Sequence, residues 1–277
     1  MKKNRFFLRS FFTLRSCTKW FDHLDADPYL RRCVRFEPQL AEKLHRPYRR
    51  VGLSTQQRLN LLLEHFNIST QIGLTKIVAI TYRESLEIAH FEDREKNTFV
   101  LSLTRPGQFG KEGDVAMHLS DGQNRLYSMC FSLRETAGIR ELDIGCVQGP
   151  DDEKSREMIR QLTRGMHGLR PRSLMLEAAR DFAQATHCAR LRLVGNHKHI
   201  YRSWRKRKDI SFNYDEFCAD IDASVQDGGD WIIPLVGELR PISEVASKKR
   251  AETLRRRNLL ETIHQEIMAQ FSHITSN

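Results

Sequence analysis

The spacing of the apolar residues changes along this chain of 277 residues, and the changes predict its architecture. In the first 75 residues, apolar side chains recur at helical spacing. The clearest case is the stripe of Leu59, Leu62 and Phe66, which follows a capping box that starts at Ser54. We therefore expect a helical region over residues 1–75.

From Thr75 onward the apolar period falls to two, and β-branched and aromatic residues become frequent. This pattern predicts five strands, in the segments TKIVAITY, TFVLSLTR, GDVAMHLS, RLYSMCFSLRE and ELDIGCVQ. The turn residues Asp121–Asn124 separate the third segment from the fourth and favour a hairpin. The sheet should therefore begin as an antiparallel meander.

The meander leads into a β-helix-helix-β unit. Gly149 ends the fifth strand, a helix follows, and Pro171 suits the first turn of a second helix. The apolar strands RLRLVG and WIIPLVG come next, and helical spacing returns over residues 243–271. We expect an α+β fold with a mixed, mainly antiparallel sheet. Its parts are a basic helical N-terminal region (1–75), a core (76–240) and a C-terminal helix (241–277).

The charge of the chain is unevenly distributed. The net charge is +10, yet residues 76–240 carry 25 basic and 25 acidic side chains, whereas residues 1–75 carry 14 basic against 6 acidic ones. A neutral core with a basic leading segment is typical of a catalytic or ligand-binding protein, so we expect no nucleic-acid partner. The basic run Arg202, Arg205, Lys206, Arg207 and Lys208, with Trp204 inside it, could contact phosphates while the indole stacks on a base, but we interpret it as a solvated helix face.

The chain lacks the marks of a secreted or membrane-spanning protein. Its six cysteines are scattered without a CxxC pair, so we expect free thiols, no metal site and a cytoplasmic location. No apolar run reaches the roughly 18 to 20 residues that span a bilayer. Residues 1–16 are basic and aromatic, with Phe7, Phe11 and Leu14 on one side of a short helix. That helix either docks on the protein or lies peripherally on an anionic inner-membrane surface.

The bend between the two helices of the β-helix-helix-β unit is a candidate anion site. Backbone amides, three arginines and a helix start come together there, and such arrangements suit phosphate or carboxylate groups. The alternative is an ordinary helix connection with solvated arginines. The residues of this candidate cofactor site are Arg164, Gly165, His167, Gly168, Arg170 and Arg172.

A second candidate site follows the strand RLRLVG. Open α/β sheets bind ligands at strand ends, and His197, His199 and Tyr201 stand there with side chains that can move a proton. Structural or merely exposed histidines are the alternative. Glu141 and Asp143 share one strand face, where Glu141 would serve as general base beside a cleft or be an ordinary surface carboxylate. We expect the bend and the histidines to line one shared hollow.

Several strings resemble the VirK/YbjX family of bacterial proteins, over nearly the whole chain. They are GDVAMHLSDGQNRLYSMCFSL, LDIGCVQGP, MHGLRPRSLMLEAAR and VGNHKHIYRSWRKRK, of which MHGLRP and GNHKHIY are the most specific. The resemblance implies a role in envelope integrity, virulence or resistance to antimicrobial peptides. It implies no particular chemistry, because no biochemical activity is established for that family.

The order of elements is also similar to that of the GNAT acyltransferases, at the level of fold alone. That likeness implies acyl-CoA or acetyl-CoA as cofactor, with Asn196 near its pantetheine arm. The Arg/Gln-x-x-Gly-x-Gly/Ala loop of those enzymes is missing after ELDIGCVQ, so the bend at 164–172 would bind the cofactor phosphates instead.

Two hypotheses follow. The first is an acyl-CoA-dependent acyltransferase that acts on a small molecule, an envelope component or a peptide. In it, His197, His199 or Tyr201 would manage the proton of an amine or hydroxyl nucleophile. The second is a non-enzymatic accessory factor at the inner membrane surface, which docks through its basic N-terminus and supports envelope or surface-protein assembly.

Overall fold

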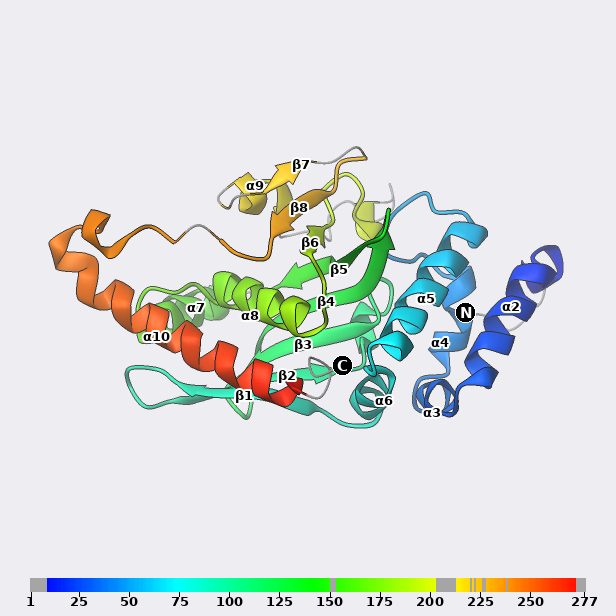
Figure 1. Cartoon of the computed structure of the whole chain (residues 1–277), viewed down its shortest axis with the longest axis horizontal. Coiled ribbons are helices and arrows are strands. Elements are labelled where there is room, and N and C mark those ends of the chain that lie inside the picture. The colour runs from blue at the N-terminus through cyan, green and yellow to red at the C-terminus, as the bar shows by residue number, and fades with distance from the viewer. Residues whose placement is uncertain are drawn as a thin grey trace.

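The computed structural model contains an open sheet of eight strands in the order β1-β2-β3-β4-β5-β6-β8-β7, with helices around it (Figure 1). It describes residues 9–149, 153–202, 213–219, 221, 223–225, 228–237 and 239–272. The strands are β1 (Leu86–Glu92), β2 (Thr98–Thr104), β3 (Val115–Ser120), β4 (Arg125–Thr136), β5 (Ile139–Gln148), β6 (Arg190–Leu193), β7 (Ser224–Val225) and β8 (Trp231–Pro234). The α+β class predicted from the apolar spacing is confirmed.

The strand directions also follow the prediction. β1 to β5 pair antiparallel, β5 and β6 run parallel, and β8 pairs antiparallel with both β6 and β7. In the hairpin between β3 and β4, the Asp121 carboxylate accepts hydrogen bonds from the backbone N–H groups of Gln123 (2.9 Å) and Asn124 (2.6 Å). Between β5 and β6 lie α7 (Glu153–Gly165) and α8 (Pro171–Ala185), so the β-helix-helix-β unit is confirmed.

One predicted strand is wrong. The segment TKIVAITY forms the helix α6 (Thr75–Arg83), whose Ile77, Val78 and Tyr82 are buried against α3 and β2. Positions 77, 78 and 82 share one helical face, and this packing outweighs the weak strand preference of the β-branched residues. The strand β1 follows α6 and was not predicted.

The other helices form two groups. α2 (Leu14–Ala26), α3 (Pro28–Phe36), α4 (Gln39–Glu42) and α5 (Thr55–Gln71) join α6 at one end of the sheet, on the right in Figure 1. In front of the sheet lie α8 and α10 (Ser247–Gln270), and α9 (Tyr214–Ala219) lies near β7. Short 3₁₀ turns are η1 (Lys43–His45), η2 (Gly107–Phe109), η3 (Ile200–Arg202) and η4 (Ile242–Glu244).

One hydrophobic core joins these groups. It includes Trp20 of α2, Phe131 of β4, Phe182 of α8 and Phe271 at the end of α10. The centroid of the Phe182 ring lies 5.1 Å from that of Phe131 and 5.2 Å from that of Phe271. These contacts attach the C-terminal helix to the sheet through α8.

The six cysteines are free and buried, as their scattered positions predict. Burial raises the pKa of both Cys33 and Cys188 to about 12, so these two thiols stay protonated at neutral pH. Over the described ranges, no group of three His, Cys, Asp or Glu side chains is placed to hold a metal ion. None of the described helices has the length and apolarity needed to cross a bilayer.

Candidate anion-binding site

A connecting segment, residues 46–53, joins the N-terminal helices to α5 and runs along the sheet. The backbone N–H of Arg49 donates to the Lys111 carbonyl (2.6 Å), and that of Val51 donates to the Lys198 carbonyl (3.0 Å). The connecting segment therefore lies between the loop that carries Lys111 and the turn that follows β6. Its position brings two consecutive arginines into the interior.

These arginines meet carboxylates of the sheet. The Nη2 and Nη1 atoms of Arg50 lie 2.7 Å and 2.9 Å from the two Asp143 oxygens, and its Nε donates to Asp230 at 2.8 Å. Arg49 also donates to Asp143, which is wholly buried in β5. Burial acts to raise the pKa of Asp143, but Arg49 and Arg50 hold it well below its ordinary value. Asp143 is therefore an ionised, internal anchor for the connecting segment.

A second buried carboxylate anchors the start of the same region. Asp114 accepts hydrogen bonds from Lys43 Nζ (2.5 Å) and the Ser132 hydroxyl (2.6 Å), and the Tyr48 hydroxyl also donates to it. Burial opposes ionisation, yet Lys43 keeps the pKa of Asp114 well below its ordinary value. The two anchors together fix the chain from Lys43 to Arg50 against the sheet.

Glu141 has a structural environment of the same kind. It is wholly buried, and it accepts hydrogen bonds from Arg190 Nε (2.6 Å), Arg192 Nε (2.8 Å) and the Thr136 hydroxyl (3.1 Å). The expected positions, beside a cleft or at the surface, are both wrong, because two arginines of β6 enclose this carboxylate. Glu141 is therefore a buried carboxylate that forms ion pairs with Arg190 and Arg192 of the neighbouring strand β6.

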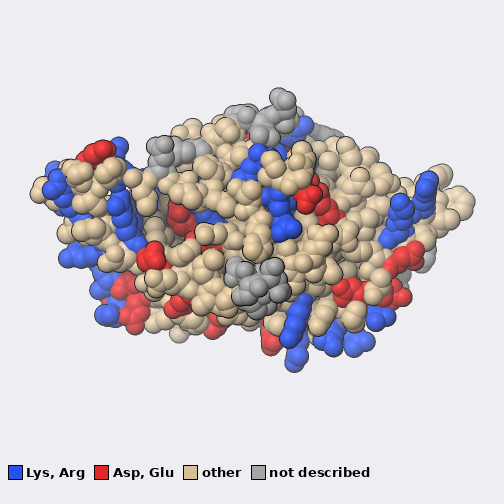
Figure 2. Space-filling model, viewed as in Figure 1, with Lys and Arg blue, Asp and Glu red and all other residues tan. Residues whose placement is uncertain are grey.

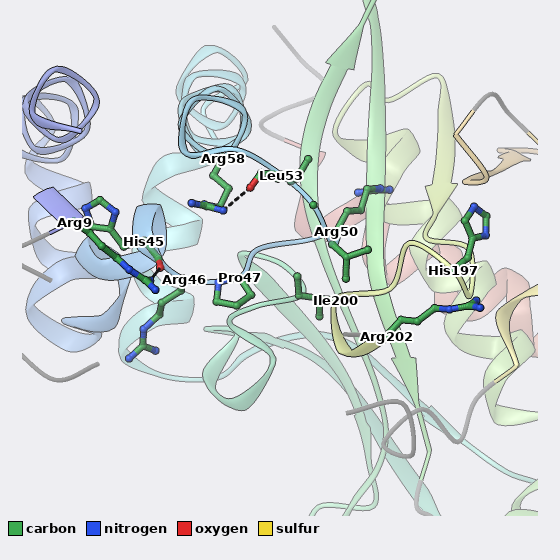
Figure 3. A pocket seen from close by; sticks show the side chains of 12 residues that line it. Arg9, His45, Arg46, Pro47, Arg50, Leu53, Arg58, His197, Ile200 and Arg202 are labelled. Carbon is green, nitrogen blue, oxygen red and sulfur yellow. Dashed lines mark hydrogen bonds between the residues drawn. The ribbon is translucent and has the colours of Figure 1, made fainter. Parts of the chain in front are cut away.

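Above Arg50 the structure contains a pocket of about 660 Å³, which we call the basic pocket. Five arginines and two histidines line it, and none of its twelve lining residues is Asp or Glu. Figure 3 shows that some of these side chains belong to the helical side and the others to the sheet side. The basic side chains are Arg9, His45, Arg46 and Arg58 on the helical side, and Arg50, His197 and Arg202 on the sheet side.

Positive charge on the helical side is only partly neutralised. Arg58 donates to the carbonyls of Leu44 (2.8 Å) and Leu53 (2.6 Å) and to the Thr55 hydroxyl (3.0 Å), all uncharged acceptors. No carboxylate of the described residues pairs with it. Burial, and then the charge of Arg9, lower the pKa of Arg58. The guanidinium group of Arg58 is therefore held in place with its charge uncompensated.

The other wall residues differ in charge, and Arg46 pairs with the Glu42 carboxylate at 2.9 Å. Burial lowers the pKa of the His45 imidazole, and the nearby Arg58 and Arg9 lower it further, so His45 is neutral at pH 7. Arg202 is exposed, and within the described chain its side chain has no hydrogen-bond or ion-pair partner. A hollow with fixed guanidinium groups and no acid suits an anion, above all a phosphate.

The residues predicted to move protons have three different environments. His197 is exposed and lines the basic pocket. His199 is buried, with its Nε2 3.4 Å from the Tyr214 hydroxyl and 3.5 Å from Glu112 Oε1. Tyr201 lines a neighbouring hollow of about 330 Å³. The sequence therefore identified one wall residue of the basic pocket and two of its neighbours.

Asn196 has a capping role. Its side-chain oxygen accepts a hydrogen bond from the Tyr214 backbone N–H (3.0 Å), and its amide nitrogen donates to Asn213 (2.7 Å). Both contacts lie at the start of α9. A pantetheine arm near Asn196 would have to compete with these hydrogen bonds.

The bend between α7 and α8 lies at a separate hollow of about 450 Å³, which we call the α8 hollow. Its lining includes Tyr127, Arg160 and three arginines of the predicted site, which are Arg164, Arg170 and Arg172. It shares no lining residue with the basic pocket. The prediction that the bend and the histidines line one hollow is wrong, because α7 and α8 carry the bend to a different part of the molecule.

The remaining residues of the bend shape it. Gly165 packs against the turn between β1 and β2, where its carbonyl accepts from the Arg94 N–H (3.1 Å). His167 and Gly168 have left-handed φ angles of 54° and 77°, and the Gly168 N–H donates to the Thr163 carbonyl (2.8 Å). This hydrogen bond closes the end of α7, so the Gly168 amide is not available to an anion.

The fold and the pocket define an α+β protein with an open sheet and an arginine-lined pocket. The chain belongs to the family described as "Protein of unknown function (DUF535)", which it matches over residues 1–269. It is 31% identical over 274 residues to "Uncharacterized protein YbjX" of Escherichia coli (strain K12), an alignment that covers 97% of this chain and 83% of that protein. An uncharacterized protein of Haemophilus influenzae is 27% identical over 157 residues, 56% of this chain and 52% of its own length. The resemblance to the VirK/YbjX family is confirmed.

Proposed function

We propose that this protein binds a phosphate-bearing anionic ligand in the basic pocket. The observation that carries the proposal is the make-up of the walls, which contain five arginines, two histidines and no carboxylate. The volume of about 660 Å³ falls within the range of small-molecule sites, so the ligand is larger than a single phosphate ion.

The geometry of the arginines supports phosphate over other anions. A guanidinium group presents paired N–H donors in a planar fork that matches phosphate oxygens. The donors of Arg50 are already engaged by Asp143 and Asp230, so a ligand would meet the uncompensated charge of Arg58 and the exposed Arg202 instead. A bound anion would also relieve the repulsion between Arg9 and Arg58.

Acyl transfer is the second candidate function, and the α8 hollow is the observation that favours it. Four arginines line this hollow at the start of α8, where they would hold the phosphates of acyl-CoA or acetyl-CoA. The histidines lie elsewhere, so the reaction would need a substrate that spans both sites. The acceptor would be a small molecule, an envelope component or a peptide.

Ligand binding without catalysis is the simpler of the two functions. It agrees with an accessory factor that serves envelope integrity, virulence or resistance to antimicrobial peptides, which is the setting that the family resemblance implies. In that role the basic pocket would recognise a phosphorylated component of the envelope.

Thermal unfolding in the presence of inorganic pyrophosphate tests the proposal. The wild-type protein should be stabilised more by pyrophosphate than by sodium chloride of equal ionic strength. Arg202→Gln should weaken pyrophosphate binding about tenfold, because it removes a charged donor from the wall. Arg170→Gln is the matched control, since Arg170 is also exposed without a described partner but lines the α8 hollow.

The same measurement separates the two candidates. Equal stabilisation by pyrophosphate and chloride would contradict the phosphate site. Stabilisation by coenzyme A that is lost on Arg164→Gln with Arg170→Gln, and kept on Arg202→Gln, would favour the transferase.

A further inference from the structure

Apolar side chains are exposed in the residues just before α2 and at the first residue of α2. Phe11, Phe12 and Leu14 are 78%, 77% and 65% exposed, whereas Cys17 and Trp20 on the inner side of α2 are buried. Of the two alternatives for this stretch, docking on the protein does not bury Phe11 or Leu14 in the part of the chain that the structure describes, and Phe7 lies outside that part. We call Phe11, Phe12 and Leu14 the aromatic patch.

Basic residues surround the aromatic patch. Arg15 and Lys19 are exposed, and neither has a carboxylate partner among the residues that the structure describes. From Arg9 the sequence contains no acidic residue before Asp22. Exposed aromatic and aliphatic side chains among cations are typical of helices that lie in the interface of an anionic bilayer.

The aromatic patch and the basic pocket belong to the same end of the molecule. Arg9 lines the pocket and donates to the His45 carbonyl (2.8 Å), and Phe11 follows only two residues later. α2 is the outermost element at that end (Figure 1). A surface that receives the aromatic patch would therefore lie against the end of the molecule that also carries the pocket.

We infer that the anion bound by the basic pocket is the phosphate of an anionic membrane lipid, whose bilayer receives the aromatic patch. The inference rests on the proposed function, because it requires the pocket to bind phosphate. The aromatic patch supplies apolar contact with the acyl boundary, and the arginines of the pocket supply the contact with the headgroup. Neither contact needs a membrane-spanning helix.

A second basic surface, at the start of α10, has to be distinguished from the aromatic patch and the basic pocket in any vesicle-binding experiment. In the first turns of α10, Lys248, Lys249, Arg250 and Arg255 are exposed, and on the face shown in Figure 2 basic side chains gather at that end of the molecule. This surface could attract anionic vesicles through charge alone. A lipid test therefore needs variants at both ends of the molecule.

Co-sedimentation with phosphatidylcholine vesicles, with and without phosphatidylglycerol, provides the test. The full chain should pellet with the phosphatidylglycerol vesicles and stay in solution with phosphatidylcholine alone. Phe11→Ser with Phe12→Ser should lower the bound fraction about tenfold and leave the pyrophosphate-induced thermal shift unchanged. Val236→Ser with Leu239→Ser is the matched control, because it removes two equally exposed apolar side chains elsewhere (81% and 73%).

The remaining variants assign each contact. Arg202→Gln should weaken both vesicle binding and pyrophosphate binding. Vesicle binding that survives loss of the aromatic patch, or that disappears with Lys248→Gln and Lys249→Gln instead, would overturn the inference. A wild-type protein that binds pyrophosphate or glycerophosphoglycerol but no vesicles would also overturn it, and the phosphate pocket would stand. The absence of a pyrophosphate shift would instead refute the proposed function itself.

Discussion

Arg50 and Asp143 form a two-pronged ion pair in the interior, between the connecting segment and the strand β5. Both side chains are buried, and Arg50 extends the pair to Asp230 beside β8. The floor of the basic pocket is thus attached to two strands that are far apart in the sequence. The ion pair therefore fixes the backbone that carries the pocket lining, while the charge of Arg50 itself is balanced by the two carboxylates.

Removal of the Asp143 carboxylate should be strongly destabilising. Asp143→Ala leaves Arg49 buried without its ion-pair partner and Arg50 with Asp230 alone, so we expect a loss of about 3 to 5 kcal/mol in the free energy of unfolding. Urea denaturation measures this loss. Asp25→Ala is the control: its pair with Arg31 is exposed, and the expected change is below about 0.5 kcal/mol. Similar losses for the two variants would contradict the anchoring role of Asp143.

Stability should fall as the pH is lowered from 6.5 towards 4. Burial lowers the pKa of His65 from 6.5 to about 4, so the unfolded chain binds a proton in this interval and the folded chain does not. The contribution of His65 to the free energy of unfolding is fully present above pH 6.5, and up to about 3 kcal/mol of it is lost by pH 4. Asp114 and Asp143 have lowered pKa values and lose their contributions only below about 3.8, outside this interval.

Urea denaturation across this pH range checks the effect. His65→Gln cannot titrate, and it should be less stable than the wild type at pH 7 and show a shallower decline below it. His90→Gln, at an exposed histidine, is the comparison variant. An unchanged slope in His65→Gln would show that other groups cause the decline.

Gly145 should not tolerate a side chain. It is the extra residue of a bulge in β5, and a Cβ atom there would lie 1.8 Å from the Glu112 carbonyl oxygen. Gly145→Ala must displace the loop that carries Lys111, so we expect a loss of more than about 2 kcal/mol. Gly110→Ala is the control in that loop, where the nearest atom would be 3.2 Å away and a smaller loss is expected. Thermal unfolding of the two variants decides between these expectations.

Much of the fold was predictable because its signals are local. The turn at Asp121, the capping box at Ser54 and the proline at 171 each act within a few residues, and all three lie where the sequence placed them. The segment TKIVAITY was misread because its β-branched residues fit a strand as well as a helix. Only its packing against α3 and β2 distinguishes the two.

The site was predictable only in part. His197 was identified from its place after a strand, but nothing marked the arginines of the connecting segment as functional. The sequence nevertheless contained a signal for the buried carboxylates. Glu141 and Asp143 alternate along β5, and Arg190 and Arg192 alternate along β6 directly opposite them. Such matched alternation indicates buried ion pairs between neighbouring strands. Read in this way, it would have excluded Glu141 as a surface group.

The sequence by itself determined the class of fold, the direction of most strands and the family, because periodicity, turn residues and shared motifs are properties of short stretches of chain. Only the tertiary structure decided which charges meet. It placed Arg9, Arg58 and Arg202 around one pocket and the bend at 164–172 around another. The physical reason is that attraction and repulsion between charges depend on distance in space, and the distances between these residues are set by how the helices pack on the sheet.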